Sequence, residues 1–218
     1  MKFKLSKILK DKADVKNAIL NKRFITYATS YSFKIADEFE CDYNFVADGW
    51  PVALYSSILS KKKIHRLSFF KLRDFWISEA KQKKIGIIGY EEKDVIHLKR
   101  ELSSLKIVPQ FISDGFKNDD DLCSLIESQS KNVEIIFLGI SQPRQEQIMK
   151  RLDYLEGSVS IISCGAFWIQ EILHKENVTP LATALLLVPI TRFWKKPKTM
   201  LARTIYALPK LVNNLQNK

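Results

Sequence analysis

The sequence is poor in the residue types that build disulfide frameworks and metal sites. It contains three cysteines, an odd number, and Cys41, Cys123 and Cys164 are widely spaced in apolar surroundings. The three histidines also lack the mutual spacing of metal ligands. The sequence therefore suggests neither a disulfide framework nor a metal knuckle, and it fits a reducing cytoplasm.

Acidic residues are missing from the last part of the chain. The formal net charge is +11, yet no Asp or Glu follows Glu176, so the C-terminal segment carries most of the excess. Such an asymmetry indicates a polyanionic partner. Nucleic acid, anionic lipid and a diphosphate-bearing substrate all fit this charge.

Long hydrophobic runs are also absent. The longest, residues 181–190, is shorter than the about 20 residues of a membrane span. Residues 1–23 are basic but lack the continuous apolar stretch of a signal peptide. We therefore expect a cytoplasmic protein whose contact with a membrane is peripheral.

What the sequence does contain is an alternation of short apolar runs with helical patterns. The expected strands are residues 24–29, 43–47, 84–90, 109–113, 134–140 and 158–164, and the clearest helices are residues 92–105, 120–128 and 142–155. Runs such as residues 135–138 are apolar on both faces, which is typical of a parallel sheet covered by helices on both sides. The pattern predicts an α/β, Rossmann-like, doubly wound and mostly parallel sheet over residues 1–178. Residues 179–218 are then a basic helical appendage.

In this architecture ligands bind beyond the carboxyl ends of the strands. Those loops contain Asp48, Gly89, Asp114, residues 139–145 and Gly165. Asp48 and Gly49 follow a strand and precede an expected helix. The carboxylate fits either a general base or a turn and helix cap.

Residues 139–146 leave a buried strand and enter a helix that has Pro143 near its first turn. This placement predicts free backbone N–H groups at the positive end of a helix, which suit a phosphate or sugar hydroxyls. An ordinary connection capped by Ser141 is the alternative. Gln142, Gln145 and Glu146 add hydrogen-bonding groups that packing does not require.

Several spaced motifs occur in a fixed order: residues 47–49, then Arg66 after a basic turn, then Gly139-x-x-x-Pro143-x-Gln145-Glu146, then residues 165–167. In this combination the chain resembles the WecG/TagA/CpsF family of bacterial glycosyltransferases. The resemblance runs from about Phe24 to Arg203.

The resemblance implies roles for individual residues. Asp48 matches a family aspartate that acts as the base on the acceptor hydroxyl, and Arg66 matches an arginine that offsets charge on the departing diphosphate. Gln145 matches a glutamine that binds the donor, and Thr29 stands where the family has an asparagine. The full set of expected substrate-binding residues is Thr29, Gly49, Gly89, Asp114, Gly139, Gln142, Pro143, Gln145, Glu146 and Gly165.

Residues 118–121 contain an Asp-x-Asp spacing that many glycosyltransferases use to hold a divalent ion. They also precede a helical pattern, where acidic residues cap the helix and favour its dipole. We favour the cap, and the resemblance implies a reaction without a metal or cofactor.

The tail interleaves aromatic and basic residues, as interfacial segments do. Arg192, Trp194, Lys196 and Arg203 are the expected membrane- or phosphate-facing residues. A helix packed on the catalytic domain with a solvated basic face is the alternative.

The sequence thus predicts an inverting glycosyltransferase. The expected substrates are a UDP-linked hexose or N-acetylhexosamine and a lipid-diphosphate-linked sugar of a surface polysaccharide. An anionic membrane surface is the expected further partner, and the resemblance is compatible with a homo-oligomer. Two alternatives stay open: an inactive nucleotide-binding scaffold, and a basic nucleic-acid-binding protein.

Overall fold

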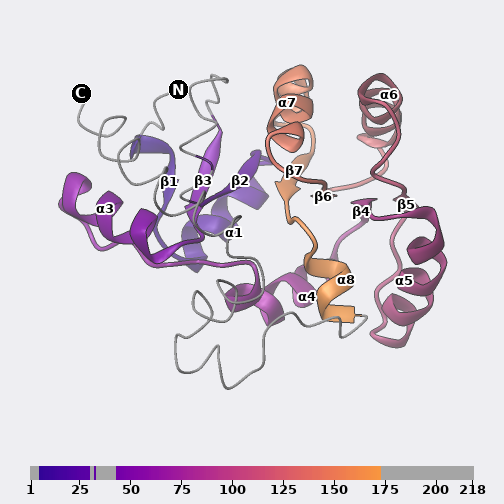
Figure 1. The fold of residues 1–218 in the computed structure, drawn as a ribbon, viewed down its shortest axis with the longest axis horizontal. Coiled ribbons are helices and arrows are strands. Elements are labelled where there is room, and N and C mark those ends of the chain that lie inside the picture. The colour runs from indigo at the N-terminus through magenta and orange to yellow at the C-terminus, as the bar shows by residue number, and fades with distance from the viewer. Residues whose placement is uncertain (1–4, 30–31, 33–42, 173–218) are drawn as a thin grey trace, which may run out of the picture.

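A computed structural model describes residues 5–29, 32 and 43–172 of the chain. This part forms one sheet of seven strands in the order β1-β3-β2-β7-β6-β4-β5 (Figure 1). Every strand pair is parallel, so the predicted parallel α/β sheet is confirmed. The strands are β1 (Ile8–Leu9), β2 (Ile25–Ala28), β3 (Asn44–Ala47), β4 (Ile85–Gly89), β5 (Phe111–Ser113), β6 (Ile135–Gly139) and β7 (Ser160–Ser163).

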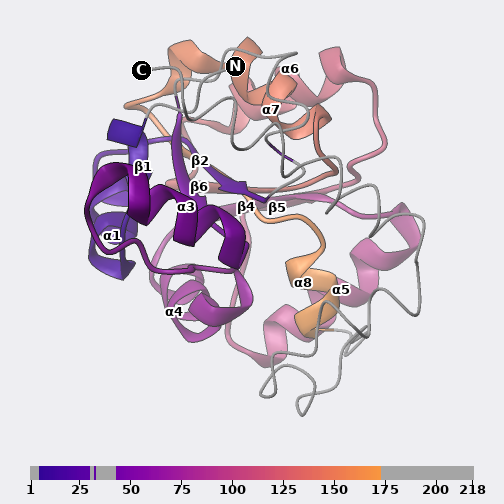
Figure 2. The same cartoon turned by 60° about the vertical axis from the view of Figure 1, so that its left-hand side comes forward.

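Helices cover both faces of the sheet (Figures 1 and 2). The helices are α1 (Lys12–Leu20), α3 (Trp50–Ser60), α4 (Arg73–Gln82), α5 (Glu92–Ser104), α6 (Asp119–Gln129), α7 (Arg144–Arg151) and α8 (Phe167–Ile172). Side chains of α1, α4, α5 and α8 enter one apolar core, and those of α6 and α7 enter the core on the opposite face. Helix α3 packs over β1 and β3 at one end of the sheet. The arrangement is a three-layer sandwich, as strands apolar on both faces require.

Six strands were expected from the sequence, and each occurs within a few residues of its expected place. The two-residue strand β1 was missed, because residues 1–23 show a basic composition and no apolar run of strand length. The helix expected over residues 142–155 begins later, at Arg144, and ends at Arg151. A short 3-10 helix, Asp153–Leu155, follows it. The boundary expected at residue 178 and the appendage of residues 179–218 lie outside the described residues.

An aromatic cluster joins the loop before α4 to the sheet. The Phe69 ring stacks on Trp76 at 4.7 Å between centroids and lies 5.0 Å from the Tyr27 ring of β2. It also contacts Phe167 of α8 at 4.4 Å. Aromatic pairs in such geometries add about 0.5–1.5 kcal/mol beyond the area they bury. The cluster therefore fixes the segment that carries Arg66, three residues before Phe69.

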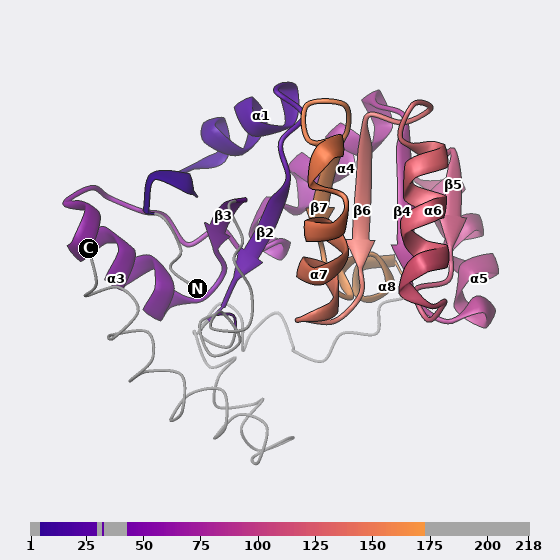
Figure 3. The same ribbon diagram turned by 90° about the horizontal axis from the view of Figure 1, so that it is seen from above.

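All strands point the same way, so their carboxyl ends lie along one edge of the sheet, at the lower side in Figure 3. The connection that follows β4 leads outward to β5, whereas the connection that follows β6 leads to β7 on its other side. The chain thus diverges between β4 and β6, which is where open α/β sheets form their ligand crevice.

Close packing between the ends of β4 and β6 requires glycine there. Gly89 and Gly139 end their strands as register partners. Gly89 has a φ of +137°, and a Cβ there would lie 2.6 Å from the Gly139 carbonyl oxygen. Gly89 therefore meets both a conformational and a steric demand that only glycine satisfies.

We expect Gly89→Ala to destabilise the fold more than Gly157→Ala. Gly157 also has a positive φ, +91°, but a Cβ there would meet nothing within 4 Å. Both variants carry backbone strain of about 1–3 kcal/mol, and only Gly89→Ala adds overpacking of about 1–3 kcal/mol. Urea unfolding followed by circular dichroism measures the difference. Equal losses in the two variants would show that the contact with Gly139 relaxes freely.

Candidate active site

The sheet brings the predicted site residues to one edge in a defined order. Asp48 follows β3, Thr29 follows β2, Gly165 follows β7, Gly139 ends β6, and Asp114 follows β5 at the far side. Neighbouring strands lie about 4.8 Å apart, so Asp48 and Gly139, three strand spacings apart, are separated by about 14 Å. An elongated ligand is needed to contact both.

Asp48 and Arg66, which the sequence analysis paired, are neighbours in the structure. The Arg66 Nε donates to the Asp48 carbonyl oxygen at 2.9 Å. The Asp48 N–H in turn donates to the Ala28 carbonyl of β2 at 3.0 Å, and the Leu67 N–H donates to the Ala47 carbonyl at 2.9 Å. Both side chains are half-buried. The Arg66 guanidinium makes no other hydrogen bond or ion pair to the described residues.

Tyr27 is the residue before the last in β2, close to the carboxyl edge of the sheet. Burial raises the pKa of the Tyr27 hydroxyl well above its ordinary value, the Trp76 side chain opposes this rise, and the charge of Asp48 adds to it. The phenol is therefore protonated at neutral pH. The charge effect of Asp48 on this hydroxyl places an uncharged donor within electrostatic reach of the Asp48 carboxylate.

The strongest polar cluster surrounds Glu146 of α7. Its Oε1 accepts hydrogen bonds from Thr26 Oγ1 at 2.9 Å, from Gln142 Nε2 at 2.8 Å and from Gln145 Nε2 at 2.8 Å. Glu146 is only 6% exposed. The carboxyl group thus ties α7 to β2 and fixes which end of each glutamine amide faces it.

The same network reaches Thr29. Gln142 Nε2 also donates to the Tyr27 carbonyl at 3.3 Å, and its Oε1 accepts from Ser32 Oγ at 3.1 Å. Ser32 Oγ accepts from the Thr29 N–H at 2.9 Å and lies 3.3 Å from Thr29 Oγ1. The structure therefore brings Thr29 to Gln142, Gln145 and Glu146, although more than 100 residues separate it from them in the sequence.

Two buried acceptors in this cluster have no partner among the described residues: Glu146 Oε2 and Gln145 Oε1. Burial raises the pKa of Glu146, while its hydrogen bonds from Gln145, Gln142 and Thr26 oppose the rise. An unpaired buried acceptor is costly. Protonation of Glu146 adds a hydrogen-bond donor to this cluster, which has two unpaired acceptors among the described residues.

Packing within the protein accounts for the glycine at position 139. A Cβ on Gly139 would lie 2.8 Å from the Gly165 carbonyl oxygen and 2.9 Å from Tyr90 Oη. Tyr90 Oη donates to the Gly165 carbonyl at 3.3 Å and accepts from the Trp168 N–H at 3.2 Å. Tyr90 and Gly165 thus approach Gly139 closely, and its expected role in substrate binding stays a prediction. Tyr90 has a φ of +78°, a strained conformation of the kind that clusters at functional sites.

Arg144, the neighbour of Gln145, holds the loop after β5. Its Nε donates to Asp119 Oδ1 at 2.7 Å, its Nη1 donates to the Gly115 carbonyl at 2.7 Å, and its Nη2 donates to the Lys117 carbonyl. One guanidinium therefore fixes three points on residues 115–119, as its planar fork permits. No role for Arg144 was expected from the sequence.

The acidic run of residues 118–121 forms a helix start, as favoured above. Asn118 is the N-cap of α6, and its side chain accepts from the Asp121 N–H at 2.8 Å. Asp119 pairs with Arg144 and Asp120 pairs with Arg151. Among the described residues, no group of three or more His, Cys, Asp or Glu side chains is placed to hold a metal ion.

The free N–H groups expected at the start of the helix after β6 are not all present. Pro143 is the N-cap of α7. The Gln145 N–H donates to the Ser141 carbonyl at 3.2 Å, and the Glu146 N–H donates to the Pro143 carbonyl at 3.1 Å. The expectation was wrong for these two groups, because the turn before α7 supplies their acceptors. The alternative of a Ser141 cap is also wrong, since no side chain caps this helix.

Gly49 and Asp114 occupy ordinary structural positions at the edge. Gly49 is the N-cap of α3, and Asp114 Oδ1 accepts from the Phe116 N–H at 2.6 Å, which is an Asx turn. Neither contact tests a role in binding. The expected tail residues Arg192, Trp194, Lys196 and Arg203 lie outside the described residues.

Sequence reasoning missed the polar groups that lie inside strands. Ser163 of β7 donates to Thr26 Oγ1 at 3.2 Å and accepts from the Tyr27 N–H at 3.1 Å. Both hydroxyls are buried within their strands. Their only signal is a hydroxyl at an inward position, and the partner Glu146 becomes evident only when the strands are aligned.

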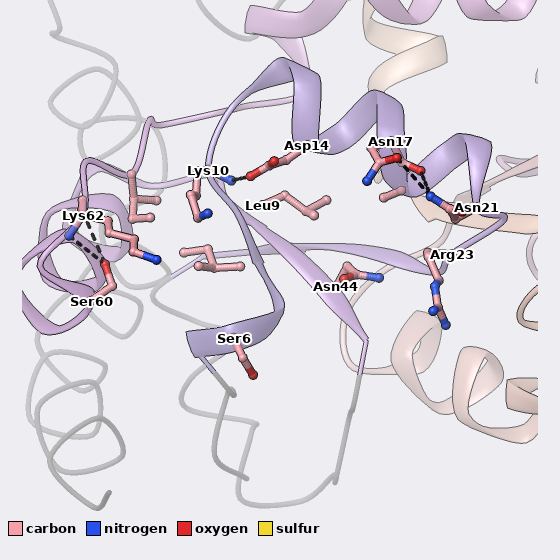
Figure 4. A pocket seen from close by; sticks show the side chains of 13 residues that line it. Ser6, Leu9, Lys10, Asp14, Asn17, Asn21, Arg23, Asn44, Ser60 and Lys62 are labelled. Atoms are coloured by element: carbon pink, nitrogen blue, oxygen red, sulfur yellow. Dashed lines mark hydrogen bonds between the residues drawn. The ribbon is translucent and has the colours of Figure 1, made fainter.

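A polar pocket of about 680 Å³ lies away from this edge, at the amino-terminal side of β2 and β3 (Figure 4). Its polar lining includes the cations Lys10, Arg23 and Lys62 and the amides Asn17, Asn21 and Asn44. None of the predicted site residues lines it. The candidate active site is therefore the carboxyl edge, where the predicted residues meet.

No helix in the described part of the chain is both long and apolar enough to cross a membrane.

We expect Arg144→Lys and Arg144→Ala to loosen residues 114–119 and to lower the free energy of unfolding by about 1–3 kcal/mol. A lysine ammonium cannot reproduce the three-point fork. Hydrogen–deuterium exchange of the peptide spanning residues 114–119 measures the effect. Arg151→Lys is the control, because Arg151 is also on α7 and pairs with α6 but contacts none of the loop carbonyls. Unchanged exchange in both Arg144 variants would contradict this role.

We expect Glu146→Gln to change how stability depends on pH. Burial raises the pKa of Glu146 in the folded state above its ordinary value of 4.5. The contribution of protonated Glu146 to the free energy of unfolding is therefore complete below about pH 4.5. It is lost as the pH rises through the folded-state pKa. The Tm of the parent protein should therefore fall relative to that of Glu146→Gln as the pH is raised. Glu92→Gln, at an exposed position on α5, is the control for differential scanning fluorimetry across pH. A Tm difference that grows in the opposite direction would refute the raised pKa.

Comparisons with known proteins identify the family of the chain. A galactosyltransferase of Shigella boydii, "UDP-Gal:alpha-D-GlcNAc-diphosphoundecaprenol beta-1,4-galactosyltransferase", is 26% identical over 76% of each chain. The sequence model of the glycosyl transferase WecG/TagA/CpsF family matches residues 15–218. This match includes every residue placed at the carboxyl edge, and the chain therefore belongs to the WecG/TagA/CpsF family of glycosyltransferases.

Proposed function

We propose that the protein is an inverting, metal-independent glycosyltransferase. It transfers a hexose or N-acetylhexosamine from a UDP-sugar to a sugar linked through diphosphate to a lipid, in the biosynthesis of a surface polysaccharide such as a capsule or teichoic acid. The observation that carries the proposal is the contact of Arg66 with Asp48 at the carboxyl end of β3. The printed name of the Shigella boydii relative, which joins a UDP-sugar donor to a diphosphoundecaprenol-linked acceptor, supports these substrate classes.

Asp48 is the general base in this proposal. Its carboxylate takes the proton of the acceptor hydroxyl as that oxygen attacks the anomeric carbon of the donor sugar. The bond between the anomeric carbon and the diphosphate oxygen breaks, and UDP leaves with the electron pair. A single displacement of this kind inverts the anomeric configuration. General base catalysis contributes about 10²- to 10⁴-fold to such steps.

Arg66 offsets the charge that develops on the leaving diphosphate. Its Nε is held by the Asp48 carbonyl, which leaves the Nη groups for phosphate oxygens. A guanidinium is permanently charged and matches phosphate in a bidentate manner. This cation does the work that a divalent ion does in other transferases, so the reaction needs neither metal nor cofactor.

The donor binds along the edge between β2 and β4 in this proposal. Gln145 and Gln142 are oriented by Glu146, and Thr29 is joined to them through Ser32. Oriented amides and hydroxyls match the many hydroxyls of a nucleotide sugar. The edge then accommodates the donor between Asp48 on one side and the Arg144-held loop on the other.

Peripheral association with the inner face of the plasma membrane follows from an acceptor whose lipid remains in the bilayer. The basic tail, with Arg192, Trp194, Lys196 and Arg203, is the proposed contact for anionic lipid or phosphate. A polyanionic membrane also accounts for the net charge of +11 without nucleic acid.

Two variants test the chemistry. We expect Asp48→Asn to lower kcat by about 10²- to 10⁴-fold, because the amide cannot take the acceptor proton. Arg66→Ala should lower kcat by about 10²- to 10³-fold through lost charge stabilisation. UDP release in the presence of lipid-diphosphate-linked acceptor and EDTA measures both, and NMR of the product reports its anomeric configuration.

Asp74→Asn is the control, since Asp74 is exposed on α4 and contacts only Arg73 among the described residues. Transfer by Asp48→Asn at the parent rate would refute the general base. Activity that EDTA abolishes and magnesium restores would refute the metal-free reaction. An absence of transfer from any UDP-sugar would favour the inactive scaffold instead.

A further inference from the structure

The outer face of α3 carries an apolar stripe that no described element covers. The side chain of Leu54 is 53% exposed and that of Ile58 is 63% exposed. They are four residues apart and therefore lie on the same side of the helix. On the inner face of the same helix, Val52 and Ala53 are buried against β3. Helix α3 thus packs on the sheet through one face and presents large aliphatic side chains on the other.

A basic turn continues this stripe at the end of the helix. Lys61, Lys62 and Lys63 are all exposed. No acidic residue occurs anywhere between Asp48 and Asp74. Aliphatic side chains beside a cluster of lysines are typical of helices that lie in the interface of an anionic membrane.

We propose that this face of α3, defined as Leu54, Ile58, Lys61 and Lys63, docks on an anionic membrane surface and presents Asp48 to the lipid-linked acceptor. The inference rests on the proposed function for the identity of the acceptor. It differs from the contact expected of the tail, because it assigns a membrane-facing surface to the catalytic domain itself.

The position of α3 in the chain supports this assignment. Gly49 is the N-cap of α3, so Asp48 directly precedes the helix. A helix of 11 residues is about 16 Å long, which keeps Leu54 and Ile58 within about that distance of Asp48. Figures 1 and 3 show α3 at the end of the sheet beyond β3, where its outer side faces away from the other strands. The diphosphate of a lipid-linked acceptor stays at the headgroup level, because charge is costly inside the bilayer.

Charge complementarity selects the membrane over two other occupants. Residues 177–218 contain no Asp or Glu, so the tail offers no carboxylate to pair with the lysines. A second copy docked through the same face would bring the two lysine clusters toward one another. Two exposed aliphatic side chains are also far fewer than the 20–30 residues a side of a standard protein interface.

Vesicle co-sedimentation of the full-length protein tests the proposal. The probes are vesicles of phosphatidylglycerol with phosphatidylcholine, and vesicles of phosphatidylcholine alone. Each lysine near an anionic surface contributes about 1 kcal/mol, so we expect Lys61→Asn/Lys63→Gln to weaken binding to the anionic vesicles about 25-fold. Asn is chosen at position 61 because this C-cap residue has a φ of +52°. Leu54→Gln/Ile58→Gln should weaken binding to the same vesicles.

The chain offers a matched control for each variant. Lys99→Gln/Lys106→Asn removes two exposed lysines, one of them also at a positive φ, +60°. Ile96→Gln/Val108→Gln removes two aliphatic side chains that are 78% and 73% exposed. These positions lie on or near α5, at the opposite end of the sheet from α3 (Figure 1). Lys62 is left unchanged because it also lines the pocket of Figure 4.

Transfer assays with two acceptors separate docking from chemistry. The α3 variants should lose transfer to a vesicle-embedded acceptor and retain transfer to a short-chain acceptor in solution. Unchanged vesicle binding, or equal loss with both acceptors, would overturn the proposal, and so would control variants that lose as much binding as the α3 variants. If the parent protein transfers to neither acceptor, the proposed function fails, while the vesicle binding still decides whether α3 docks.

Discussion

The buried carboxyl group of Glu146 is the constraint on which the rest of the site depends. A carboxyl group removed from water must be supplied with donors or protonated. Thr26, Gln142 and Gln145 supply three donors to one of its oxygens. Because these donors come from β2, from the turn before α7 and from α7 itself, their alignment joins the middle of the sheet to the helix above it. The same contacts decide how both glutamine amides are turned.

Arg144 extends this constraint in the other direction. It lies two residues before Glu146, yet its guanidinium reaches residues 115–119 beyond β5. Residues 142–146 therefore hold both halves of the carboxyl edge. The side chains of this short segment therefore order the loops around the proposed site.

The proposed chemistry lies at one end of this ordered edge. Asp48 and Arg66 come from β3 and from the loop before α4, and the aromatic cluster around Phe69 fixes that loop on the sheet. Helix α3 begins directly after Asp48 and exposes its apolar and basic side outward. Under the two proposals, substrate from solution and substrate from a membrane have separate approaches, the first along the strand ends and the second along α3.

The sequence by itself determined the fold class, the family and the residues at the strand ends, because apolar periodicity and short motifs are local in the chain. It did not determine β1, because a strand of two residues is too short to produce a hydrophobic pattern. It also did not determine the hydrogen-bond donors to Glu146, which lie up to 120 residues away in the chain. The sequence also led us to expect too many free N–H groups at the start of α7. In the folded turn, the carbonyl groups of Ser141 and Pro143 accept hydrogen bonds from two of them. The tertiary structure decided these points because strand order sets which distant side chains meet.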